Sequence, residues 1–112
     1  MARTYRQRRI YDHRQTEVRQ AVDRAMYELG LEIKPDATDY EVRGARSMST
    51  LSWGEQVKVL LATSPGGGTQ VIAESKLVFG FVDWGRNRSN VEALFTSMAA
   101  LLGPGEIATL ER

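Results

Sequence analysis

The spacing of apolar residues along the chain predicts two amphipathic helices. Apolar positions recur at i, i+3, i+4 and i+7 over 18–29 and again over 91–102, which places each set on one helical face. Gly30 follows the first stripe and Gly103 the second, and glycine readily adopts the positive φ that ends a helix. The two stripes consist of Val18, Ala21, Val22, Ala25, Met26 and Leu29, and of Val91, Leu94, Phe95, Met98, Leu101 and Leu102.

Candidate capping residues precede both stripes. The first helix has two alternative starts, Asp12 with Gln15 three residues later, or Thr16. The second is expected to start at Ser89, with Glu92 completing a capping box.

Four other segments alternate with the period of two that is typical of strands. They are 4–11, 40–48, 55–63 and 69–79. The first is polar on both faces, which suits an edge strand. The last two are joined by a Ser-Pro-Gly-Gly-Gly segment at 64–68, which predicts a hairpin loop. The apolar positions expected to face inward in this hairpin are Val57, Val59, Leu61, Val71, Ala73 and Leu77.

The resulting order is β-α-β-β-β-α. Two helices with one apolar face each need a common surface, and an antiparallel sheet with one buried face supplies it. We therefore expect an α+β fold, a two-layer sandwich with both helices packed on one face of the sheet. Residues 1–103 are expected to form a single domain, and 104–112 a C-terminal tail.

The hairpin also sets an expected register, in which paired positions sum to about 133. Trp53 then lies opposite Gly80, and Trp84 follows at the same end of the sheet. We expect both helix N-termini there as well, which would concentrate partial positive charge beside nearby arginines.

This end of the sheet is the candidate ligand site. Aromatic residues would supply apolar contact and arginines would hold an anion, so the ligand would be a small hydrophobic or anionic molecule, a small amphiphile, or an acidic partner segment. An open pocket of about 300 Å³ or more would favour this interpretation. The candidate ligand-binding residues are Trp53, Phe81, Trp84, Arg86, Arg88 and Arg14.

An alternative interpretation of the same residues is structural. The aromatic side chains would fill the open end of the sandwich, and Arg86 or Arg88 would pair with Asp83 or Glu55.

Charge distribution suggests a second function. The formal net charge is only +1, yet seven of the chain's arginines fall within residues 1–24. An Arg-rich first strand interleaved with tyrosines indicates a nucleic-acid or protein interaction module, with nucleic acid the less favoured partner because the isoelectric point is only about 8.1. The residues concerned are Tyr5, Arg6, Arg8, Arg9 and Tyr11. Strands at the two sheet edges would also allow a homodimer or higher homo-oligomer.

Several chemistries find no support in the sequence. There is no Cys, and His13 is the only His, so thiolate and multi-histidine metal sites are excluded. The glycines at 66–68 lack the Gly-Lys-Ser/Thr ending of a phosphate-binding loop and precede a strand. No two carboxylates have the spacing of an acid and a base. We therefore expect a protein that is not an enzyme and has no cofactor or metal.

No stretch approaches the roughly 18 apolar residues of a membrane span. The basic N-terminus is not followed by the apolar segment of a signal peptide. On this basis the sequence predicts a cytoplasmic protein, unless a native leader has been removed.

Two short motifs resemble those of a known group of proteins. They are Ser52-Trp53-Gly54-Glu55 and the segment 83–91, in which Asp-Trp-Gly is followed by Asn87, Asn90 and Val91. The chain resembles small bacterial α+β domains of unknown function, with a helix-grip or TATA-box-binding-protein-like arrangement, over residues 5–102. The resemblance implies a fold and a bacterial source, and no activity or binding residue.

Overall fold

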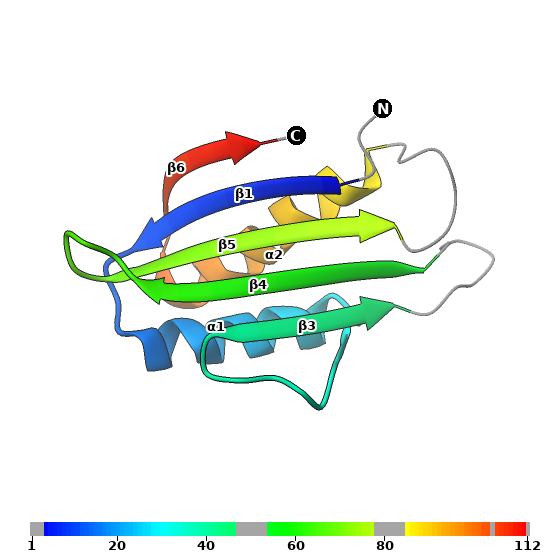
Figure 1. Ribbon diagram of the computed structural model, residues 1–112, viewed down its shortest axis with the longest axis horizontal. Helices are drawn as coiled ribbons and strands as arrows, with labels where there is room; N and C mark the ends of the chain where they lie inside the picture. The colour runs from blue at the N-terminus through cyan, green and yellow to red at the C-terminus, as the bar shows by residue number, and fades with distance from the viewer. Residues whose placement is uncertain (1–3, 47–53, 78–84, 104, 112) are drawn as a thin grey trace.

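The computed structural model describes residues 4–46, 54–77, 85–103 and 105–111. Figure 1 shows an antiparallel sheet lying in front of two helices. The strands run side by side in the order β2-β3-β4-β5-β1-β6, and every neighbouring pair is antiparallel. The elements are β1 (Thr4–Tyr11), α1 (Gln15–Glu28), β2 (Glu32–Ile33), β3 (Glu41–Arg46), β4 (Glu55–Thr63), β5 (Thr69–Leu77), α2 (Arg86–Leu102) and β6 (Glu106–Glu111).

The predicted α+β class is confirmed. Alternate residues of β3, β4 and β5 point toward the helices and are fully or almost fully buried. The inward positions predicted for the hairpin are correct at every site whose side chain is described, for example Val57, Val59 and Val71. The inward strand residues and the helix stripes form one core.

The β4–β5 hairpin fixes the register of the sheet. Glu55 pairs with Leu77 and Thr63 with Thr69, so the register is one residue from the expected one. The loop closes with a hydrogen bond from the Gly67 N–H to the Ser64 carbonyl, and Gly67 and Gly68 both have positive φ.

Helix α1 buries the stripe that its sequence predicts, apart from the half-buried Leu29. Gly30 has a φ of 72° and its N–H bonds to Tyr27, while the Leu31 N–H bonds to Met26. These two bonds form a Schellman motif, which satisfies carbonyls at the helix end. Both predicted starts are wrong, because Arg14 is the N-cap residue and no side chain caps this end.

Helix α2 begins earlier than predicted. The Ser89 N–H donates to the Gly85 carbonyl, so Ser89 lies inside the first turn and does not cap the helix. Gly85 is the N-cap residue, with a φ of 77°. The first turns of the helix bury two polar side chains, Asn87 among the added residues and Asn90 just after the predicted start. The sequence missed this start because asparagines on a buried face interrupt an apolar stripe.

Strand β1 is internal, which corrects the expectation of an edge strand. It pairs with β5 on one side and β6 on the other. Its alternation, predicted as polar, buries Tyr5 and Tyr11 against the helices. Because tyrosine carries a polar hydroxyl, the sequence pattern did not reveal that this face of β1 belongs to the core.

The C-terminal residues do not form the expected tail, because 106–111 form β6 and pair with the free edge of β1. Gly105 makes this return possible. A Cβ at Gly105 would lie 2.6 Å from Cζ of Tyr11, so only glycine allows the chain to pass so close to the ring.

The two helices start at opposite ends of the sheet, contrary to expectation. Because β1 is antiparallel to β5, Tyr11 pairs with Thr69 beside the hairpin loop, and α1 starts there. The hydroxyl of Thr69 donates to the His13 carbonyl at 2.9 Å, and a ring nitrogen of His13 lies 2.8 Å from the Leu102 carbonyl oxygen. The start of α1 therefore meets the end of α2.

The three glycines of the hairpin loop are expected to differ in how much stability a substitution by alanine costs. A Cβ on Gly68, at a φ of 77°, would clash with the Tyr11 carbonyl oxygen, whereas Gly67 has positive φ but open space around it. Gly68→Ala is expected to lower the free energy of unfolding by at least about 2 kcal/mol and Gly67→Ala by about 1 kcal/mol. Gly66→Ala, with neither constraint, is the matched control and is expected to change it by less than ~0.5 kcal/mol. Urea unfolding measures all three, and equal effects at all three sites would contradict the geometry.

Candidate functional site

Three of the predicted ligand-binding residues, Trp53, Phe81 and Trp84, lie outside the described residues. Of the other three, two lie at the same end of the sheet and one does not. Arg86 and Arg88 lie in the first turn of α2, and Arg14 is the N-cap residue of α1 at the opposite end of the sheet. The expected cluster therefore lacks Arg14.

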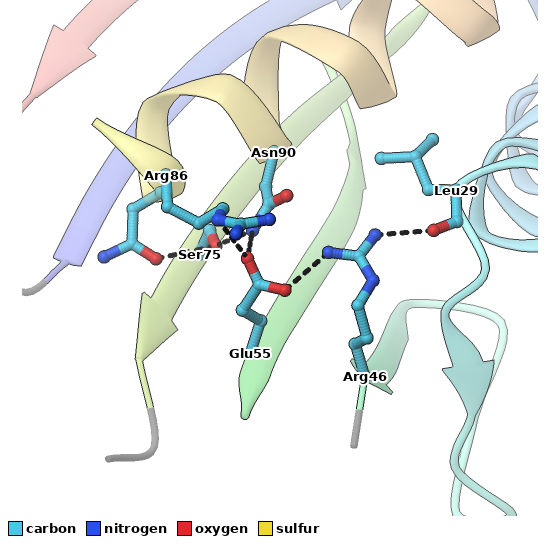
Figure 2. A network of polar contacts seen from close by, with 7 residues as sticks. Leu29, Arg46, Glu55, Ser75, Arg86 and Asn90 are labelled. Carbon is cyan, nitrogen blue, oxygen red and sulfur yellow. Dashed lines mark hydrogen bonds and ion pairs between the residues drawn. The ribbon is translucent and has the colours of Figure 1, made fainter. Parts of the chain in front are cut away.

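A buried carboxylate organises the end of the sheet where α2 begins. The Glu55 side chain has no exposed surface and lies between two arginines from different elements (Figure 2). Nη1 of Arg46 lies 2.5 Å from Oε2 of Glu55, and Nε of Arg86 lies 3.3 Å from Oε1. One of the ion pairs that the structural alternative allowed, Arg86 with Glu55, is therefore present, whereas the aromatic side chains of that alternative lie outside the described residues.

The same arginines connect the carboxylate to both helices. Nη2 of Arg46 donates to the Leu29 carbonyl at the C-terminal end of α1, where no basic residue of the helix itself is present. An arginine at this position satisfies an otherwise unpaired carbonyl and opposes the negative end of the helix dipole. Figure 2 shows Arg46 reaching Glu55 with one nitrogen and Leu29 with another.

Three buried polar side chains complete this network. The amide of Asn90 donates to Oε1 of Glu55 at 3.1 Å and contacts Oγ of Ser75 at 3.2 Å. The Ser75 hydroxyl donates to Oδ1 of Asn87 at 2.9 Å. Burial of such groups is tolerated because they are mutually hydrogen-bonded. These hydrogen bonds stabilise the ion pairs of Glu55, and they occupy the Ser75 hydroxyl. We call Arg46, Glu55, Ser75, Arg86, Asn87 and Asn90 the Glu55 network.

Arg88 has a different environment. Its Nε lies 2.8 Å from Glu92 one turn along α2, and this hydrogen bond raises the pKa of the Arg88 guanidinium. A groove of about 680 Å³ lies between α2 and the end of α1, with Arg88 and Glu28 in its lining. The hydroxyl of Ser97 and the guanidinium of Arg24 lower the pKa of the Glu28 carboxyl.

The tyrosines predicted to stack on nucleic-acid bases face the core. Tyr5 and Tyr11 are 4% and 2% exposed, so neither ring offers a free face. Arg9 also points inward, with its guanidinium 4.3 Å from the centre of the Phe95 ring and its Nε 2.6 Å from Oε1 of Gln7. Burial raises the pKa of the Tyr11 hydroxyl, and the charge of nearby Arg9 partly opposes this.

Arg6 and Arg8 point the other way, onto the sheet face that no described helix covers (Figure 1). By register, Arg6 lies beside Glu74, Glu74 beside Lys58, and Lys58 beside Arg43, in one row across four strands. Nη2 of Arg6 lies 2.8 Å from Glu74, and Nζ of Lys58 lies 4.0 Å from it. We call the outward positions of β3, β4, β5 and β1 the open face. Its cations are Arg6, Arg8, Arg43, Lys58 and Lys76, and its carboxylates are Glu41 and Glu74.

The sequence missed the open face because its cations come from four separate strands. The signal was present in the alternation of Arg43, Lys58 and Lys76 with buried neighbours. Only strand order and register make them neighbours.

Within the described part of the chain, no three His, Asp or Glu side chains are grouped so that they could hold a metal ion. None of the described helices is long and apolar enough to cross a bilayer. Comparison of the sequence with protein-family models and with curated proteins found no match.

The Glu55 network generates a stability prediction. Glu55→Gln keeps the shape of the side chain but weakens its hydrogen bonds with Arg46 and Asn90, and we expect a loss of about 2 kcal/mol because charge-assisted bonds to a buried carboxylate are replaced by neutral ones. Glu92→Gln removes the exposed ion pair with Arg88 and is the matched control, with an expected effect much smaller than that of Glu55→Gln because solvent screens the pair.

Urea unfolding at low salt measures both variants. Equal losses for Glu55→Gln and Glu92→Gln would show that the buried ion pairs stabilise the protein no more than an exposed one does.

Proposed function

We propose that this protein is a noncatalytic binding module that engages an acidic partner across the open face of its sheet. The carrying observation is the excess of cations over carboxylates on four adjacent strands, on a face that no described helix covers. Neighbouring strands lie about 4.8 Å apart, so the row from Arg43 to Arg6 extends over about 14 Å. The row also contains Glu74, so its charge is positive only on balance, and a net charge of one sign attracts a partner of the opposite sign.

The geometry of the cations supports the same proposal. Arg43, Lys58 and Lys76 line a shallow depression of about 80 Å³ together with Gln56 and Glu74. The side chains of Arg6 and Arg43 are 47% and 41% exposed, so their existing ion pairs are open to exchange with carboxylates of a partner.

The proposed absence of catalysis is supported by how hydroxyls and the imidazole are used. The Ser75 hydroxyl is held by asparagines, and the Thr69 hydroxyl donates to a backbone carbonyl. The imidazole of His13 contacts the Leu102 carbonyl and Glu17, and contacts no described hydroxyl. The Ser97 hydroxyl does donate to the Glu28 carboxylate, but the lowered pKa of that carboxyl makes it a weak base for activating an alcohol.

Charge reversal on the open face tests the proposal. Lys76→Glu is expected to weaken binding of labelled poly-L-glutamate about fivefold, a change of ~1 kcal/mol, because the lysine is exposed among other cations. Arg14→Glu makes the same change in net charge at an exposed residue away from the open face, and is the matched control with an expected effect below about twofold. Fluorescence polarisation over a series of salt concentrations measures both. Equal weakening by the two variants, or no binding of the polymer, would refute the proposal.

The groove between α2 and the end of α1 favours a second candidate function, the binding of a small hydrophobic or anionic molecule. Its volume of about 680 Å³ is within the range typical of ligand sites, although the groove is open to solvent, and its lining includes Arg88 and Gly85. Its carboxylates, Glu28 and Glu92, are both paired with arginines, which reduces their repulsion of an anion.

Anilinonaphthalene sulfonate, a hydrophobic anion, is a suitable probe of this groove. Arg88→Gln is expected to weaken its binding about fivefold, since the guanidinium lies in the lining. The matched control is Arg19→Gln, which also removes an ion pair with an acidic residue one turn away, Asp23, and neither Arg19 nor Asp23 lines the groove. A fluorescence titration in which the two variants behave alike would exclude this site, with circular dichroism confirming that both remain folded.

A further inference from the structure

The open face carries a small aliphatic area beside its cationic row. Its outward residues nearest the Glu55 end include Lys58 and Lys76, whereas Leu60 and Ile72 are paired one row closer to the hairpin loop. That row continues to Glu41 on β3 and to Arg8 on β1, so its aliphatic part is confined to β4 and β5. Ile10 lies diagonally next to them on β1, beside Gln70. Leu60, Ile72 and Ile10 are all only partly buried, although they point away from the core.

The distance between the two rows indicates what shape of partner can contact both. Outward residues two positions apart on a strand are separated by about 6.6 Å, so the cationic and apolar rows lie within the roughly 10 Å width of one helix. A helix placed across the strands therefore contacts both rows at once. Its acidic side chains would meet Lys58 and Arg6, and its apolar side chains would meet Leu60 and Ile72.

The edges of the sheet favour a protein partner over nucleic acid. Glu32 lies on β2 beside Ala45 of the open face, and on β6 Glu111 and Glu106 occupy the register positions beside Arg6 and Ile10. Acidic positions at both edges restrict the cationic region to the central strands, and this opposes a long polyanion that extends beyond them. The tyrosines of β1 are buried, so no described aromatic ring is available there to stack on bases.

We infer that the open face binds an amphipathic acidic helix of a partner protein, lying across β3, β4, β5 and β1 with glutamates or aspartates on the cationic row and aliphatic side chains on Leu60 and Ile72. This inference rests on the proposed function and specifies the chemistry of its partner. It requires both halves of the face, whereas binding by charge alone requires only the lysines and arginines.

A designed peptide tests the inference. The probe is a labelled peptide of about 14 residues, or ~21 Å of helix, with leucines at i, i+3, i+4 and i+7 and glutamates flanking that stripe. Its control has the same composition in scrambled order, and a single-stranded oligothymidylate of about 20 nucleotides serves as the nucleic-acid probe. The protein variants are Ile72→Thr, which keeps a β-branched residue in the strand, and Lys76→Glu.

The amphipathic peptide is expected to bind at least about fivefold more tightly than the scrambled one. Ile72→Thr is expected to weaken the amphipathic peptide about fivefold and to leave poly-L-glutamate binding unchanged. Lys76→Glu is expected to weaken both ligands. Thermal unfolding of the variants provides the check on folding.

Two other outcomes separate the inference from the function on which it rests. Equal binding of both peptides without an effect of Ile72→Thr, or tighter binding of the oligonucleotide with the same dependence on Lys76, would overturn the helical partner but keep an anion-binding face. Failure of every anionic probe to bind, or insensitivity of all binding to Lys76→Glu, would overturn both.

Discussion

The buried carboxylate of Glu55 is the interaction on which the arrangement of both helices depends. Through Arg46 it connects the sheet to the C-terminal end of α1, and through Arg86 and Asn90 it connects the sheet to the first turns of α2. A charge without exposed surface needs such partners, because the cost of removing it from water is recovered only when its hydrogen bonds are all made. The network thus sets where α1 ends and α2 begins relative to β4.

The consequence of placing both helices on one side is an open sheet face on the other (Figure 1). Core formation constrains the inward residues of each strand to be apolar, and leaves the outward residues to vary. In this protein the outward residues combine cations from four strands with a small aliphatic area. The structure therefore separates stability, which resides in the core and the Glu55 network, from the surface to which we assign binding.

Local patterns predicted most of the fold. The stripe of α1 and the strands 4–11 and 55–63 were correct because periodicity reports directly which residues share a face. The errors occurred where polar residues are buried or where an interaction is distant. Asn87 and Asn90 concealed the start of α2, and β6 was missed because its strand partner, β1, is about a hundred residues away in the chain.

The sequence alone determined the α+β class, the hairpin and the inward faces of the central strands, since each follows from contacts between residues close in the chain. It also gave the pairing of Arg86 with Glu55 as one of several alternatives, and the structure selected it. Tertiary structure decided that Arg14 lies far from Arg86, that Tyr5 and Tyr11 are buried, and that Arg6, Glu74, Lys58 and Arg43 form one row. These outcomes depend on which strands become neighbours, and that choice is made by the summed packing of the whole core, which no single segment encodes.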